Sequence, residues 1–478
     1  MDKKQQTALT QFVSQLSKKQ LQDFAVSAAQ ITPSLYYELT AQSGKLDFET
    51  EFNDIKQTIK TTIKKHVNDE GLWSNSTVIV VNELLLADLQ RFTRRGQQGY
   101  YAYAFHGILF VLLNAGKIQS TILPFDDTFK TTINTALKKL TALVQQIKDQ
   151  VNASTKQNMI QETLKIFNRK IWDGKEKTRY KIISSIIPLI PESMLTIVTQ
   201  TMTNSIARIS DGGYDGYIGN DLPDAQAMEI IIKARLKYHF GKADQARALL
   251  DKNLDDPNVR LERVKFALND KDYELAAKLC QEGDWRNMSW KDIWQKQLIQ
   301  IYSTTHQDQD LEKILRRRLL TNNTDAYQPL KQLYIRQNKW QRIRSDLLKD
   351  CQQQLTTENN AFVLNIEHEY AKLLAVIADT SYLIYQYTPV LYQQFPEEIS
   401  HSYYDYLISN DHYANKAAYK RVGDKLIYFA KVANPHQALT WISWLQKKYP
   451  YRSAMQEQLM STRDNIQEII EEAKQTPS

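Results

Sequence analysis

The chain has 478 residues, long enough for two or three hydrophobic cores or a repeating array, so a single small domain is excluded. Hydrophobic residues make up 42% and charged residues 24%, which excludes a disordered chain and a disulfide scaffold. The net charge of +7 is the small excess of 61 basic over 54 acidic residues, and it does not by itself indicate nucleic acid as a partner.

The turn residues are scarce, with only 14 Gly and 12 Pro. A β-sandwich or a Rossmann sheet needs many more residues of these types at its turns. The composition therefore predicts an all-α protein.

The first 210 residues show apolar residues at three- and four-residue spacing, the period of amphipathic helices. Two or three helices are expected within residues 7–39. Further helices are expected at residues 52–63, 76–91, 99–115, 127–148, 157–172, 177–187 and on to about 209. We expect residues 1–210 to form an N-terminal helical region.

Residues 211–222 hold four of the 14 glycines and form the clearest boundary in the chain. The carboxylates of Asp211, Asp215, Asp221 and Asp224 invite comparison with a calcium loop. Their spacing lacks the alternate acidic positions and the closing Glu of such a loop, which favours an exposed connector. We expect a helical-repeat region at residues 223–478.

After this loop the predicted helices become short and regular. Residues 240–254 overlay on residues 270–284 with a displacement of about thirty positions, matching Ala246 with Ala276 and Leu249 with Leu279. Residues 338–351 form a weaker third copy, with Trp340 where Tyr273 stands. This period predicts a tetratricopeptide-like α-solenoid of helical hairpins, although an ordinary helical bundle has the same three- and four-residue periodicity.

Cys280 and Cys351 are the only cysteines, too few for a disulfide framework or a four-ligand zinc site. The N-terminus has no apolar run of signal-peptide length, and residues 76–89 and 107–116 are too short or too polar to cross a bilayer. We therefore expect a cytoplasmic protein with no membrane span.

The segment LQKKYPYRSAMQEQL, residues 445–459, and the block before it at 415–442 resemble the closing part of bacterial proteins with an N-terminal SWIM-type zinc finger. Matching positions are Tyr449, Pro450, Arg452 and Ala454. Residues 324–348 and 16–39 are similar to other helical blocks of the same family. The resemblance implies a helical fold and a separately encoded partner, such as a zinc-finger protein or an ATPase.

The zinc finger of that family is missing from this chain. Its motif requires Cys-x-Cys followed by Cys-x-His, and neither Cys280 nor Cys351 has a histidine two residues away. The resemblance therefore covers only the helical region, and no metal or nucleic-acid role of the finger carries over.

Motifs for catalysis are also missing: there is no nucleophile elbow, Ser-x-x-Lys set or glycine-rich phosphate loop. His368 and Glu369 begin a zinc-protease pattern, but Lys372 occupies the position of its second histidine. We interpret His368 as a helix-surface or interface residue. We predict no catalytic residue, metal or cofactor, although a site assembled from distant residues stays open.

Basic and aromatic residues alternate in one segment that lacks acids between residues 328 and 345. Such a pattern could hold phosphates by charge and bases by stacking. Alternatively, its apolar residues form a buried helix stripe while the basic residues face water. The candidate nucleic-acid residues are Arg316, Arg317, Arg318, Lys331, Arg336, Lys339, Trp340, Arg342 and Arg344.

Tyrosines are numerous, 26 against 15 phenylalanines, and they cluster at residues 381–395 and 401–407. A tyrosine ring can be buried while its hydroxyl stays in water, which suits both a binding surface and the joints between helices. The candidate partner-binding residues are Tyr382, Tyr385, Tyr387 and Tyr392.

Two functions remain open at this level. The first is a cytoplasmic, non-enzymatic helical-repeat scaffold that binds a protein partner, because stacked hairpins expose a long surface and need no chemistry of their own. The alternative is a nucleic-acid-binding helical protein that uses the basic and aromatic segment near residues 316–344.

Overall fold

The computed structural model describes residue 13 and residues 16–31, 47–66, 75–120, 128–210, 221–286, 288–378, 380–408 and 415–475. Within these ranges every regular element is a helix and none is a strand. The all-α prediction is therefore confirmed.

The chain divides into two compact units, Met1–Leu279 and Cys280–Ser478, which we call unit 1 and unit 2. The dividing point lies within helix α14 (Tyr273–Arg286). The other described helices of unit 1 are α2 (Lys18–Ile31), α4 (Phe48–His66), α5 (Asn75–Gln97), α6 (Tyr101–Gln119), α7 (Thr128–Ile147), α8 (Ala153–Phe167), α9 (Glu176–Ile186), α10 (Leu195–Ser210), α11 (Asp221–His239), α12 (Ala243–Asp251) and α13 (Pro257–Asn269). Those of unit 2 are α15 (Lys291–Thr304), α16 (Asp308–Leu320), α17 (Tyr327–Arg336), α18 (Trp340–Gln354), α19 (Thr357–Ile366), α20 (Tyr370–Ala378), α21 (Ser381–Leu391), α22 (Pro396–Ile408), α23 (Lys416–Val432), α24 (Pro435–Lys448) and α25 (Ser453–Gln475).

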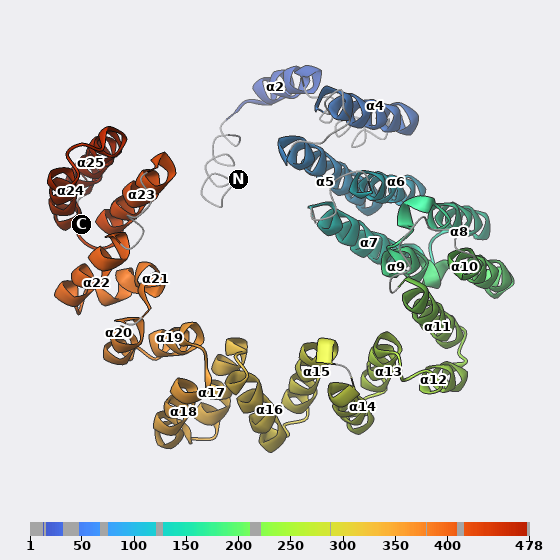
Figure 1. Ribbon diagram of the computed structural model, residues 1–478. Coiled ribbons are helices and arrows are strands. Elements are labelled where there is room, and N and C mark those ends of the chain that lie inside the picture. The colour runs from blue at the N-terminus through green and yellow to red at the C-terminus, as the bar shows by residue number, and fades with distance from the viewer. Residues whose placement is uncertain are drawn as a thin grey trace. The chain divides into compact units, whose positions relative to one another are not determined.

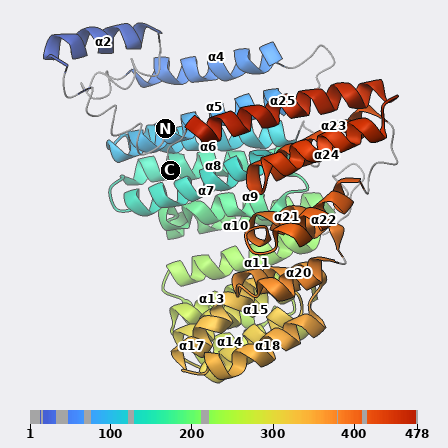
Figure 2. The same cartoon turned by 90° about the vertical axis from the view of Figure 1, so that its left-hand side faces the viewer.

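Unit 1 has two rows of helices. Helices α7, α9, α11 and α13 pack successively against one another, and Figure 1 shows them on the inner side of the curve that unit 1 forms. Helices α8, α10 and α12 lie on its outer side. In the side view of Figure 2 the helices from α5 to α11 are stacked nearly parallel. This layering is the architecture of an α-solenoid, in which each hairpin contacts its neighbours.

Five consecutive hairpins share one turn. The two helices of each hairpin, from α11–α12 to α19–α20, are separated by three residues. The middle residue of every turn has a positive φ, and these residues are 30 to 35 positions apart: Gly241, Lys271, His306, Asn338 and His368. The period near thirty that the sequence predicts is therefore confirmed.

Backbone hydrogen bonds explain why this turn recurs. In the first hairpin, the N–H of Lys242 donates to Lys237 O at 2.9 Å, and the N–H of Gly241 donates to Tyr238 O at 3.0 Å. These two bonds satisfy backbone carbonyls at the end of α11. They form when the middle residue of the turn, here Gly241, adopts the left-handed conformation. In the turns after α13, α15, α17 and α19, the third turn residue likewise donates its backbone N–H to the carbonyl five residues before it.

His368 is exposed at the left-handed position of such a turn, between two helices and not on one, so the helix-surface interpretation was wrong and the interface interpretation stays a prediction. Its Nδ1 atom is 2.6 Å from the hydroxyl oxygen of Tyr370, the first residue of α20. The sequence comparison aligned Trp340 with Tyr273, and this match is confirmed: α14 begins at Tyr273 and α18 at Trp340.

One hydrophobic cluster of unit 1 extends from Phe52 to Phe266. It includes Met202 before the expected boundary loop and Ala225 after it, so the core is continuous across that loop. Residues 211–220 lie outside the described residues, whereas Asp221 and Leu222 already belong to α11.

Among the described residues, only helix α6 has the length and apolar composition that crossing a membrane requires. It is longer than the apolar stretch at 107–116, and 56% of its apolar window is buried inside the protein. A core helix of this length has the same properties.

Candidate functional site

The arginine triplet of the basic segment forms ion pairs within unit 2. Arg316 pairs with Asp350, and Arg317 lies 2.9 Å from Asp284. Arg318 is buried and reaches two carboxylates, Asp292 at 2.7 Å and Asp325 at 2.8 Å. These arginines hold α16 to neighbouring elements.

Glu367 neutralises two further residues of the segment. Its carboxylate accepts hydrogen bonds from Lys331 at 2.6 Å and from Arg344 at 2.9 Å, and Arg344 also pairs with Glu369 at 2.7 Å. Burial alone would raise the pKa of Glu367, but the two cations hold it below its usual value. The carboxylate is therefore ionised at neutral pH.

The remaining candidates differ in their surroundings. Arg336 pairs with Asp308 at 2.5 Å, and Trp340 is buried with Lys331 5.2 Å from its ring centre. Lys339 and Arg342 have no ion pair with a described residue. Six of the eight basic candidates are thus paired with carboxylates, while the side chains of Arg317 and Arg336 keep 50% and 53% of their surface exposed. Nothing in this geometry favours phosphate binding over a structural role.

The four candidate tyrosines do not form one site. Tyr387 is buried, and Tyr392 packs edge-on against Phe429 with the ring centres 5.6 Å apart, so both belong to the core of unit 2. Tyr382 and Tyr385 are exposed, at 53% and 37% of their surface. The hydroxyl of Tyr382 donates to Glu358.

Exposed Tyr385 belongs to an aromatic group that joins three helices, in which Tyr406 and Tyr428 are partly buried. Its ring stacks on Tyr428 of α23, with 3.9 Å between centres and 21° between planes, and lies 6.5 Å from Tyr406 of α22. The ammonium group of Lys425 is 3.6 Å from the centre of the Tyr406 ring. We call Tyr385, Tyr406, Lys425 and Tyr428 the tyrosine cluster.

Lys425 is half-buried in this cluster, and its amine donates to the backbone carbonyl of Tyr406 at 3.3 Å. Burial, reinforced by the charge of Arg421, lowers the pKa of Lys425 to about 8. The aromatic faces stabilise the charged form only partly. The cluster therefore presents aromatic surface and a cation that is poorly compensated.

Sequence reasoning noted Tyr406 only within the group at 401–407 and missed Lys425 and Tyr428. Their meeting depends on the packing of α21 against α23, which are about forty residues apart in the chain. No local spacing could have found it.

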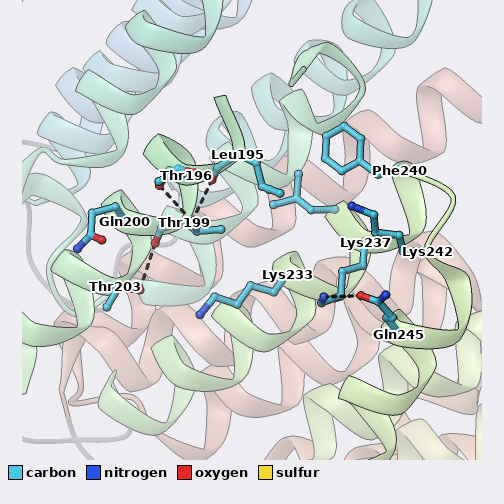
Figure 3. A pocket seen from close by; sticks show the side chains of 11 residues that line it. Leu195, Thr196, Thr199, Gln200, Thr203, Lys233, Lys237, Phe240, Lys242 and Gln245 are labelled. Carbon is cyan, nitrogen blue, oxygen red and sulfur yellow. Dashed lines mark hydrogen bonds between the residues drawn. The ribbon is translucent and has the colours of Figure 1, made fainter. Parts of the chain in front are cut away.

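A hollow of about 460 Å³ lies in unit 1 between α10, α11 and the start of α12 (Figure 3). Its three lysines all have partners: Lys233 pairs with Glu229 at 2.9 Å, Lys242 with Glu192 at 2.9 Å, and Lys237 donates to Gln245 at 3.0 Å. The hydroxyls of Thr199 and Thr203 are bonded back to their own helix, as Figure 3 shows, and that of Thr203 also donates to Glu229 at 2.8 Å. This hollow is therefore largely satisfied by its own residues.

Metal-binding chemistry has no clear place in the described part of the chain, where no three His, Cys, Asp or Glu side chains come together. Neither Cys280 nor Cys351 forms a disulfide, and both are buried. Burial raises the pKa of Cys351 to about 12, so this thiol is a poor nucleophile.

Comparison with known proteins gave one kind of match. No family model matches the chain, and no curated protein does. Among solved structures it is similar to a "circular tandem repeat protein with novel repeat topology and enhanced subunit contact surfaces", with 12% identity and a TM-score of 0.22 over 91% of this chain and 99% of the other. At so low a TM-score, the fold assignment rests on the repeated hairpins themselves.

Proposed function

We propose that the protein is a non-enzymatic helical-repeat scaffold that binds a protein partner through the tyrosine cluster. The stacking of exposed Tyr385 on Tyr428 is the observation that carries this proposal. Two rings held face to face across neighbouring helices form a rigid apolar platform, and rigid aromatic residues commonly dominate the binding energy of interfaces.

The chemistry of the cluster also indicates the kind of partner surface. Lys425 lies over Tyr406 and has no carboxylate pair among the described residues. A partner that places an acidic side chain beside its own apolar residues would compensate this cation and cover the rings. The resemblance to SWIM-type proteins adds a bacterial setting and a separately encoded zinc-finger protein or ATPase to the proposal. The cytoplasmic setting is proposed from the scarcity of cysteines.

The test compares two serine substitutions at exposed tyrosines. Tyr385→Ser removes one ring of the platform, whereas Tyr451→Ser changes a tyrosine that is 97% exposed between α24 and α25, outside the cluster. Proteins captured from the source cells by each bait are identified by mass spectrometry, and the one captured by wild type is purified for affinity measurement.

We expect Tyr385→Ser to weaken binding about thirtyfold, since truncating an anchoring residue costs ~2 kcal/mol or more. Tyr451→Ser should bind as wild type does, and Tyr385→Phe should retain most of the affinity because it keeps the ring. Equal binding by both serine variants, with wild-type helical content, would refute the proposal.

A further inference from the structure

A second hollow of unit 1 lies on its inner row of helices and was not predicted from the sequence. Its volume is about 700 Å³, and it is lined by residues of α7, α9 and α11 together with Ile187 and Pro188. Three cations contribute to its wall, one from each helix: Lys138, Lys181 and Arg235. No carboxylate is among the lining residues. We call this feature the basic hollow.

Two of the three cations are uncompensated. Arg235 forms a double ion pair with Glu262 of α13, at 2.6 and 2.7 Å, and donates to Ser184 at 2.5 Å. Lys138 and Lys181 have no ion pair with any residue that the structure describes. Both lysines line the hollow and are exposed, although neighbouring residues partly cover Lys181.

The groups around Lys181 add to the positive charge. Burial lowers the pKa of Lys181 first, and the charges of Lys177 and Lys265 lower it further. Lys177 is paired with Asp224 at 3.2 Å. Lys265 lies 3.2 Å from Glu262, the carboxylate that also binds Arg235. Asp224 and Glu262 are thus already paired with Lys177, Lys265 and Arg235, and neither carboxylate neutralises Lys181. An anion that enters the hollow would reduce the repulsion between Lys181 and these neighbouring cations.

We propose that the basic hollow binds an acidic segment of a protein partner in extended conformation. Packed helices lie about 8–10 Å apart, so crossing from α7 through α9 to α11 spans about 20 Å. An extended peptide rises about 3.3 Å per residue, and about six residues cover this distance. Cations placed one per helix match a row of carboxylates along such a peptide.

The polar residues of the hollow suit a peptide as well. Asn134 and Gln145 of α7 are exposed amides, and an amide side chain can both donate to and accept from a peptide backbone. A single phosphate group would instead require donors that converge on one point. A nucleic-acid strand would favour aromatic side chains for base stacking, and the described lining has none.

This proposal does not depend on the tyrosine cluster, which lies in unit 2. It identifies a second surface, with a recognition chemistry of its own: the binding is electrostatic and falls with rising salt concentration. Either surface could fail its test while the other stands.

The probe is a fluorescein-labelled peptide of six glutamates, with a six-glutamine peptide as the uncharged control, measured by anisotropy on the full chain at low salt. The variant Lys138→Gln/Lys181→Gln removes the two uncompensated charges of the hollow. The matched variant Lys139→Gln/Lys165→Gln removes two exposed charges of α7 and α8 that lie outside its lining and leaves the same net charge.

We expect the hollow variant to bind the glutamate peptide about tenfold more weakly and the matched variant to bind within twofold of wild type. The glutamine peptide should not bind. Absence of glutamate-peptide binding to the wild type, or equal loss in both variants, would overturn the proposal. Tighter binding of a thymidine oligonucleotide that depends on the same two lysines would also overturn it, in favour of nucleic acid.

Discussion

Glu367 provides the sharpest test of whether the basic segment is structural. This carboxylate lies in the turn between α19 and α20, with 3% of its side chain exposed, and it binds Lys331 and Arg344. Replacing it by glutamine keeps the volume but removes the negative charge. Two cations from α17 and α18 would then lose their common partner.

The expected cost follows from burial. Removing one partner of a fully buried ion pair costs about 3–5 kcal/mol. The side chains of Lys331 and Arg344 are 22% and 31% exposed, so after the substitution both can still reach water. We therefore expect Glu367→Gln to cost about 2 kcal/mol of local stability.

Hydrogen exchange followed by mass spectrometry measures this loss locally. Exchange in peptides covering α17 to α20 should become about thirtyfold faster if they exchange through a shared opening. Glu468→Gln, at an exposed position of α25, should change exchange less than threefold. Unchanged exchange in α17 to α20 would refute the structural interpretation of the basic segment.

The same variant makes a prediction about pH. The pKa of Glu367 is below its ordinary value of 4.5 in the folded protein. Its stabilising effect is therefore fully present above pH 4.5 and is lost as the pH falls through the lower folded value. The difference between wild type and Glu367→Gln should shrink in that acidic range, and a difference that grows there would contradict the assignment.

Two further predictions concern unit 1. Asp88 is buried, and burial together with nearby Glu51 raises its pKa to about 6. As the pH falls, the folded protein therefore protonates Asp88 at a higher pH than the unfolded chain does. Asp88→Asn should therefore be more stable than wild type by roughly 2 kcal/mol near pH 7, and urea unfolding should show this advantage disappear near pH 4. Gly116 faces the buried indole of Trp172. A Cβ atom added at residue 116 would lie 2.5 Å from the Cη2 atom of Trp172. The indole cannot move away freely, because its Nε1–H donates to Ile166 O at 3.0 Å. Gly116→Ala should destabilise the protein by about 1–2 kcal/mol despite the better helix propensity of alanine, and a raised melting temperature would contradict this packing.

The sequence was informative where side chains determine the fold. The small and apolar positions Ala246, Ala276 and Leu279 are buried, as their periodic spacing predicts. The shared turn was invisible, because its left-handed position is occupied by Gly, Lys, His, Asn and His in successive hairpins. A repeated backbone conformation that is stabilised by main-chain hydrogen bonds leaves little trace in residue identity.

Charge was harder to interpret than hydrophobicity. Residues 328–345 contain no acid, which suggested free cations, yet the carboxylates come from other helices: Asp308 pairs with Arg336 and Glu367 with Lys331. Partners separated by 28 and 36 positions meet only after the hairpins stack. The stacking of Tyr385 on Tyr428 was missed for the same reason.

Site-specific photo-crosslinking tests the central claim, a partner bound at the tyrosine cluster, most directly. A benzoyl-phenylalanine side chain replaces Tyr385 in one version of the full chain and Tyr451 in another, and both are irradiated inside the source cells. The account predicts a discrete crosslinked product that contains one protein for position 385 and no such product for position 451. No product at position 385, or the same product from both positions, would contradict it.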